Sequence, residues 1–464
     1  MMMNTRNQSE SAQEPNDNKL SYEIFSILES KFLFGYEEHK LRIPKQISTP
    51  TTETRSGPSS DDSINAIKNQ RGKICILCID GGGMRNIVSG KALAYLEDAL
   101  RRKSGKSNAR IAEFFDVAAG AGIGGIFTAM LFGTKDQSRP ISEATDTWKF
   151  LATQGKNFYQ LSSSSSSGSG SSILRRFLGR SSIDRSSKSM SSELEKLMRE
   201  LFSDADGGGR SLTLKDTLKP VLIPCYDLSS SAPFLFSRAD ALETDGFDFK
   251  LWEVCRATSA QPVLFQPVSM KSVNGKTHCL AVDGGLAMNN PTSAAITHVL
   301  HNKQEFPFVR GVEDLLVLSL GTGQLLEASY DSDQIKRWKA KHWARPMTRI
   351  SGDYSSEMVD HAVSMAFGQN RCNYVRIQAN GSRLGGCGPN VDYDGSPSNV
   401  KKLSDIADEM LKQKNMESVL FGGKRISEHS NSEKLDWFAD QLILEHQRRS
   451  CRIAPTVAFR QPDL

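Results

Sequence analysis

The chain has 464 residues, of which 38% are hydrophobic, and its 58 lysines and arginines exceed its 53 aspartates and glutamates by five. This length suits one large α/β domain with appended arms, or two ordinary domains. The small positive balance excludes a dedicated nucleic-acid binder, although a local basic patch can still meet an anionic membrane surface.

The first part of the chain is expected to lie outside the core. Residues 1–18 are polar and predict a disordered terminus, residues 19–37 carry apolar side chains at helical spacing, and residues 48–66 form a linker rich in serine and threonine. The amphipathic helix can dock on the core or lie on a membrane, and its acidic residues Glu23 and Glu29 favour docking. No stretch approaches 18 apolar residues and no secretory signal is visible. We therefore expect a cytoplasmic protein that is not secreted, with peripheral contact at the plasma membrane or another membrane left open.

The core is predicted to begin at Lys73, where an apolar run of strand length leads into a glycine-rich turn and then a helical pattern. A second strand, turn and helix follow between Phe114 and Phe132. This succession predicts an α/β fold with a mostly parallel sheet and helices packed on it. We place the core at 73–302 with a flexible serine-rich insert at 161–172, the rest of the core and C-terminal helices at 303–425, and a charged tail at 426–464.

The first glycine-rich turn, Asp80-Gly81-Gly82-Gly83, joins a strand to a helix. Glycines there allow a tight turn and leave consecutive amide N–H groups exposed near the positive end of a helix dipole. Such amides bind a phosphate, or they stabilise the oxyanion of an acyl-transfer intermediate, where one donor contributes about 3 kcal/mol. A structural turn without a ligand remains an alternative, because glycine turns are common in α/β proteins.

The second glycine-rich turn, residues 120–125 (GAGIGG), has two interpretations. As G-x-G-x-x-G it matches a dinucleotide fingerprint, which needs an acidic residue at the end of the next strand about twenty residues on. Glu143 and Asp146 lie near that distance, but their surroundings have a helical pattern, so we expect no nucleotide. As G-x-X-x-G the turn has the form of a nucleophile elbow, with Gly120 and Gly124 around its centre. The central residue is Gly122, and the chain contains no G-x-S-x-G.

The third motif is Asp283-Gly284-Gly285, which follows a short strand-like run. A carboxylate at the C-terminal end of a strand points into the cleft where α/β enzymes bind ligands, and it can serve there as a general base. An aspartate that caps its own turn is the alternative.

Metal and cofactor chemistry find little support in the sequence. None of the eight histidines lies in a zinc-binding array, and of the eight cysteines only Cys75 and Cys78 form a C-x-x-C, within a strand-like run. We expect reduced thiols in the core, no metal and no cofactor.

In this order and spacing, the three motifs resemble those of the patatin-like phospholipase family, and the resemblance extends from about Lys73 to Arg376. Residues 256–260 (RATSA) and 320–323 (LGTG) are also similar to the family's connecting segments. That family uses a serine/aspartate dyad, with an oxyanion hole in Asp-Gly-Gly-Gly-x-Arg-Gly, a nucleophile in Gly-x-Ser-x-Gly and an aspartate in Asp-Gly-Gly or Asp-Gly-Ala. The resemblance implies a three-layer α/β fold.

Carried over by residue, the resemblance implies that Gly82 and Gly83 donate to the oxyanion, that Arg85 is the arginine of their loop and that Asp283 is the dyad base. Asn86 stands where the family has glycine, and Gly122 stands where it has the nucleophile. The glycine elbow is similar to that of a plant subgroup of patatin-related phospholipases A, which are described as lipid acyl hydrolases.

Two functions follow from these expectations. In the first, water takes the place of the serine and Asp283 activates it to cleave acyl esters of phospholipids, lysolipids or galactolipids, or acyl thioesters. In the second, the protein binds a lipid without cleaving it. A nucleotide-binding oxidoreductase is a third alternative, which depends on the glycines of residues 120–125 alone.

Overall fold

A computed structural model describes residues 72–159, 174–204, 209–262, 264–323, 332–380, 391–419 and 423–450. At their centre lies an eight-stranded sheet with the order β10-β9-β1-β2-β5-β8-β7, in which β6 pairs with β5 off this path. The strands are β1 (Ile74–Ile79), β2 (Val117–Gly120), β5 (Val221–Asp227), β6 (Ala232–Ser237), β7 (Val268–Lys271), β8 (His278–Val282), β9 (Leu315–Leu320) and β10 (Tyr374–Ile377).

The sheet is parallel from β10 to β5 and antiparallel where β5 meets β6 and β8, and where β7 meets β8. Ile79, the last residue of β1, is in register with Leu320 on one side and Gly120 on the other, so three glycine-containing turns leave the sheet side by side. The predicted α/β fold with a mostly parallel sheet is confirmed. The antiparallel pairs β5–β6 and β7–β8 have short connections, and a hairpin can join only antiparallel neighbours.

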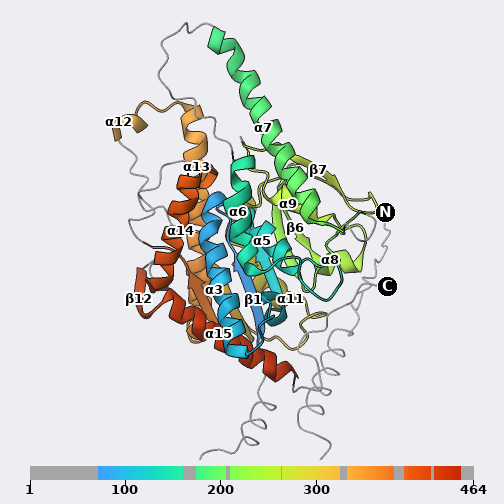
Figure 1. Ribbon diagram of the computed structural model, residues 1–464, viewed down its shortest axis with the longest axis vertical. Helices are drawn as coiled ribbons and strands as arrows, with labels where there is room; N and C mark the ends of the chain where they lie inside the picture. The colour runs from blue at the N-terminus through green and yellow to red at the C-terminus, as the bar shows by residue number, and fades with distance from the viewer. Residues whose placement is uncertain are drawn as a thin grey trace, which may run out of the picture. The chain divides into compact units, whose positions relative to one another are not determined.

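Helices cover both faces of the sheet (Figure 1). On β1, alternate side chains enter two separate apolar clusters, with Leu77 in the larger and Ile76 in the smaller. The larger cluster includes residues of α3 (Asn86–Ser104), α5 (Ile123–Phe132), α6 (Ala144–Phe158), α7 (Leu174–Leu201), α9 (Leu251–Thr258), α14 (Pro397–Lys412) and α15 (Asn431–Ser450), and the smaller includes residues of α11 (Thr292–His301) and α13 (Ala340–Ala366). The protein is therefore built in three layers.

Shorter elements connect these layers. The short helices are η1 (Gly83–Arg85), α4 (Ile111–Phe114), α8 (Arg238–Glu243), α10 (Gly284–Met288), η2 (Val312–Asp314), α12 (Ser332–Ile335), η3 (Arg371–Asn373) and η4 (Val391–Tyr393), and the remaining strands are β3 (Ser203–Asp204), β4 (Arg210–Ser211), β11 (Lys414–Val419) and β12 (Gly423–Ser430).

The C-terminal part of the chain differs from the expected charged tail at 426–464. Residues 423–430 form β12, and α15 places Leu435, Phe438, Ala439 and Leu442 fully inside the larger cluster. These four residues share one face of the helix, where Glu445 is also buried. The expectations for residues 1–18, 19–37, 48–66 and 161–172 lie outside the described residues.

The cysteine pair of β1 is divided between the faces of the sheet, because Cys75 belongs to the larger cluster and Cys78 to the smaller. Two side chains on opposite faces cannot bind one metal ion, and both are free thiols. Cys225, Cys255 and Cys279 are also free and buried, which agrees with the expectation of reduced core thiols.

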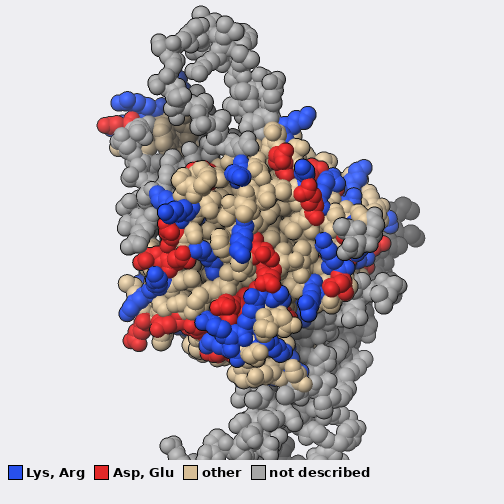
Figure 2. Space-filling view, viewed as in Figure 1, with Lys and Arg blue, Asp and Glu red and all other residues tan. Residues whose placement is uncertain are grey.

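The surface over α3, α14 and α15 carries charges of both signs side by side (Figure 2). Ion pairs join these helices, as between Lys91 and Asp408 at 2.8 Å and between Lys103 and Asp440 at 2.7 Å. This face therefore has no extended field of one sign. None of the described helices combines the length and apolar character needed to cross a bilayer.

Candidate active site

The glycine loop after β1 is held by the strands and helices around it. Asp80 forms a buried ion pair with Arg376 of β10, with an Nη1–Oδ1 distance of 2.9 Å, and the amide of Gly81 donates to the carbonyl of Asn289 at 2.9 Å. The next two amides, of Gly82 and Gly83, have no hydrogen-bond acceptor in the part of the chain that the structure describes. They precede α3, a helix of 19 residues, so they lie in the positive field of its N-terminus.

Gly83 has a backbone conformation that requires glycine. Its φ is +58°, and a Cβ atom there would lie 2.3 Å from the carbonyl oxygen of Asp392 in η4. The close approach of η4 therefore holds the glycine loop in place, although η4 is far from this loop in the sequence.

Arg85 clamps the same loop. Its buried guanidinium donates to both carboxylate oxygens of Asp392, at 2.5 and 3.3 Å, and to the carbonyl of Gly323 at 2.6 Å, and it lies 3.5 Å from Asp353. The neighbouring carboxylates raise the pKa of this guanidinium. Because its charge is balanced by two aspartates, Arg85 holds the loop in place. The structure places Arg85 in the expected glycine loop.

Asn86, which stands where the family has glycine, begins α3. Its side-chain amide donates to the carbonyl of Asp80 at 2.8 Å and to Ser89 at 3.1 Å. The substituted residue thus ties the two ends of the turn together within the core.

The second turn has the geometry of a nucleophile elbow. Gly122 joins β2 to α5 with φ +54° and ψ −125°, a conformation that side chains rarely adopt, and its amide donates to Thr258 at 3.0 Å. The flanking residues Gly120 and Gly124 pack so closely that a Cβ on either would lie within 2.6 Å of backbone oxygens. The elbow is therefore complete except for the side chain at its centre.

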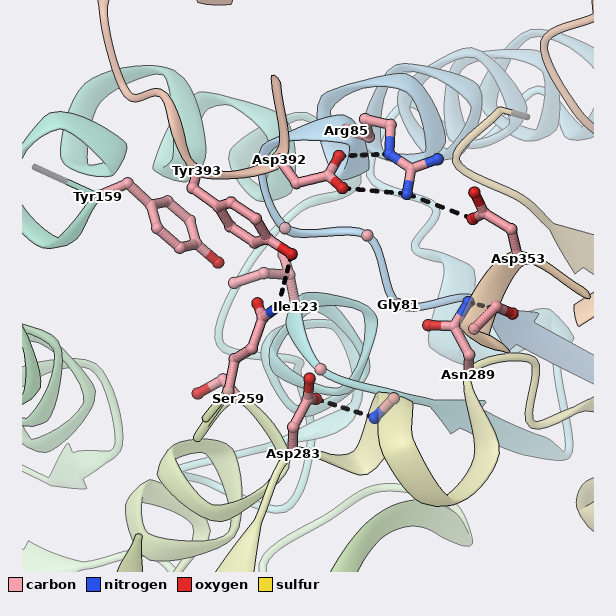
Figure 3. Close-up of a pocket in the computed structure, with 16 residues that line it drawn as sticks. Gly81, Arg85, Ile123, Tyr159, Ser259, Asp283, Asn289, Asp353, Asp392 and Tyr393 are labelled. Carbon is pink, nitrogen blue, oxygen red and sulfur yellow. Dashed lines mark hydrogen bonds and ion pairs between the residues drawn. The ribbon is translucent and has the colours of Figure 1, made fainter. Parts of the chain in front are cut away.

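The empty position at Gly122 faces Asp283. A Cβ on Gly122 would lie 3.6 Å from Asp283 Oδ1 and would meet nothing closer, so the space beside the elbow is open. Figure 3 shows Asp283 in this pocket together with the glycine loop. The structure thus brings residues of the first, second and third motifs together around one pocket.

Asp283 has an environment suited to a base. It is the N-cap of α10, where it accepts from the amide of Gly285 at 2.9 Å, and Gly284 packs against the backbone of Pro224. Burial raises its pKa to about 6, and the hydrogen bond from Gly285 opposes this shift. The carboxylate is therefore mostly ionised at neutral pH and still basic enough to accept a proton.

The pocket of about 620 Å³ is lined by side chains that the sequence did not indicate. The amide of Gln261 donates to the hydroxyl of Tyr393 at 2.5 Å, and burial raises the pKa of Tyr393 to about 12. Tyr159 lies beside Tyr393 with ring centroids 6.2 Å apart, and Ser259 donates back to its own helix at Cys255 (Figure 3). Ser259 lies in the segment 256–260 (RATSA), but no motif marks Gln261, Tyr159 or Tyr393, because they come from separate parts of the chain.

The residues of α13 that form one wall of the pocket were also not predicted from the sequence. Gly352 and Asp353 line the pocket, and Ser356 accepts from the side-chain amide of Asn289 at 2.7 Å. Asn289 in turn accepts the Gly81 amide, so α13 is connected to the oxyanion loop through one residue.

Two alternatives find no support in the geometry. Glu143 and Asp146 lie at the start of α6, where they form a capping box, and Glu143 pairs with Arg101 and Arg110. Neither residue follows a strand, as a ribose-binding acid must. Across the described ranges, no group of three or more His, Cys, Asp or Glu side chains is arranged to hold a metal ion.

Comparison with known proteins gives a consistent result. Residues 77–296 match a family model described as "Patatin-like phospholipase". The chain is 64% identical over 458 residues to "Patatin-like protein 6" of Arabidopsis thaliana, covering 97% of this chain and 89% of the relative. It is 43% identical over 372 residues to "Probable inactive patatin-like protein 9" of the same plant, covering 80% and 86%. Among solved structures, VipD from Legionella pneumophila matches with a TM-score of 0.26 and 14% identity, covering 73% of this chain and 67% of VipD.

Proposed function

Since the chain belongs to the patatin-like phospholipase family, we propose that it hydrolyses acyl esters of membrane lipids with water as the nucleophile and Asp283 as the base. The observation that carries the proposal is the open space between Gly122 and Asp283, where a Cβ would still lie 3.6 Å from the carboxylate. A water molecule there occupies the position of the absent serine hydroxyl.

The reaction proceeds in two steps. Asp283 takes a proton from the water as its oxygen bonds to the acyl carbon, and the carbonyl π electrons move onto oxygen, where the amides of Gly82 and Gly83 stabilise the charge. The intermediate then breaks its bond to the alcohol, and Asp283 returns the proton to the departing lysolipid or glycerol oxygen. No acyl-enzyme forms, and the substrates are phospholipids, lysolipids or galactolipids, or acyl thioesters.

The test compares rigorously purified protein with Asp283→Ala on lysophosphatidylcholine, with released fatty acid as the readout. We expect turnover that falls by at least about 100-fold in the variant, as for loss of a general base. Equal rates in the two proteins would overturn the proposal.

A lipid-binding protein without hydrolysis is the second candidate, because Gly122 removes the covalent nucleophile and a relative that is 43% identical is named "Probable inactive patatin-like protein 9". Release of fatty acid by the pure protein distinguishes the two candidate functions. Lysolipid binding by a pure protein that releases no fatty acid would support the second and end the first.

A further inference from the structure

An exposed apolar stripe runs along α13, the helix that forms one wall of the pocket. Its members are Trp343, Met347, Ile350, Tyr354 and Met358, which are between 36% and 66% exposed. They recur at three or four residues, so they share one face of the helix. Isolated apolar side chains on a surface are ordinary, but a contiguous stripe of five marks an interaction site.

The opposite face of α13 makes the contacts that hold the helix on the sheet. The buried residues are Ser356, Asp360, Val363 and the C-cap Phe367, and they follow the same spacing about half a turn away from the stripe. The C-terminal half of α13 is therefore packed on the sheet without the stripe. Figure 1 shows the N-terminal end of the helix projecting beyond the strands.

The helix that carries the stripe also lines the candidate active site. Between Ile350 and Tyr354, but on another face of the helix, Gly352 and Asp353 line the pocket, and Asp353 lies 3.5 Å from Arg85. A surface that binds the stripe therefore lies within one helix diameter, roughly 10 Å, of the pocket.

We propose that the α13 stripe docks the protein on an anionic lipid bilayer and so presents the pocket to lipid in that bilayer, an inference that rests on the proposed function for the identity of the substrate. Charge favours this occupant. Three exposed basic residues, Lys336, Arg337 and Lys339, lie just before α13, together with one exposed acidic residue, Asp333. Basic residues at the end of an apolar helix face attract anionic lipids, and Trp and Tyr favour the headgroup region.

The test is sedimentation with sucrose-loaded vesicles of phosphatidylcholine containing about 30% phosphatidylserine, beside pure phosphatidylcholine vesicles. The variant Met347→Glu/Ile350→Glu places two charges on side chains that are 60% and 49% exposed, so the fold is retained. We expect its partition to the anionic vesicles to fall at least tenfold. Unmodified protein should bind the anionic vesicles more tightly, and added salt should weaken that binding.

Val273→Glu is the matched control, because this valine is 55% exposed and lies between β7 and β8, at the sheet edge opposite β10. It should bind vesicles as the unmodified protein does. Hydrolysis of a soluble short-chain ester should be the same in all three proteins. Vesicle binding needs no turnover, so it reports on docking even if Asp283→Ala shows that hydrolysis is absent.

Two results would overturn the inference. One is equal vesicle binding by the double variant and the control. The other is a change from dimer to monomer by light scattering in the double variant without a loss of vesicle binding, which would assign the stripe to contact between copies of the chain.

Discussion

Gly122→Ser restores the side chain that the elbow lacks. A serine Cβ at this position would lie 3.6 Å from Asp283 Oδ1. With a C–O bond of about 1.4 Å and an angle of about 110° at the hydroxyl, the O–H···O distance comes to about 2.9 Å, a normal hydrogen bond. The new hydroxyl is therefore positioned for activation by the existing carboxylate, without movement of either element.

The expected effect on rate is large. Loss of the nucleophile costs a serine hydrolase on the order of 10⁶ in kcat, so restoring it should give at least about 100-fold on a short-chain p-nitrophenyl ester. The variant should also form a covalent adduct with a fluorophosphonate, visible as a single mass increment that the unmodified protein lacks. Strain opposes the substitution, since a side chain at φ +54° costs about 1 to 3 kcal/mol and lowers Tm by a few degrees.

Gly122→Ala is the matched control, because it carries the same Cβ and the same backbone strain but no hydroxyl. It should lose stability as the serine variant does and gain no activity. Gly122→Ser/Asp283→Ala should lose the gain in rate. A folded serine variant with neither an adduct nor a gain would refute the geometry of the elbow and its base.

Four further predictions concern the residues around the elbow. Asp283→Asn should raise the free energy of unfolding by about 1 to 3 kcal/mol at pH 7.5 and leave it unchanged below about pH 4. The pKa of Asp283 is about 6 in the folded state and 3.8 in the unfolded state, so ionisation of this carboxyl disfavours folding. Urea unfolding across this pH range checks the sign. For the same reason, hydrolysis by the unmodified protein should rise with pH through about 6 and then level off. Asp392→Ala should destabilise the protein by about 3 kcal/mol because it leaves a buried arginine short of a partner, whereas Asp408→Ala, which breaks an exposed pair, should cost under about 1 kcal/mol in the same urea titration. Gly83→Ala should lower kcat by on the order of 10², because its Cβ would lie 2.3 Å from a carbonyl oxygen and displace the oxyanion loop. Gly105→Ala is the control, since Gly105 has φ +70° but open space around it, and this variant should leave kcat unchanged. The comparison distinguishes the effect of backbone strain from that of a steric clash.

The sequence by itself determined the elements that depend on neighbouring residues. Apolar runs of strand length followed by glycines predicted β1, β2 and the turns at Gly82 and Gly122, because secondary structure and turns depend largely on residues that are close together in the sequence. Parallel strands deliver their C-terminal turns to one edge of a sheet, which brings the turns after β1 and β2 together, whereas Asp283 follows the antiparallel strand β8 and reaches them through the register of β8 on β5. The antiparallel pairing at the edge of the sheet and the burial of one face of α15 were seen only in the structure, because composition does not indicate which strands pair or which helix face is buried.

Tertiary structure alone decided what surrounds the elbow. Asp392 is 307 positions from Arg85, and Tyr393 is 132 positions from Gln261, so no local pattern connects either pair. The sequence showed that Gly122 lacks a side chain, but only the folded chain shows an open space there, with a carboxylate facing it. Contacts of this kind depend on how the sheet and its helices bring distant segments together, and the pKa of Asp283 depends on the burial that results.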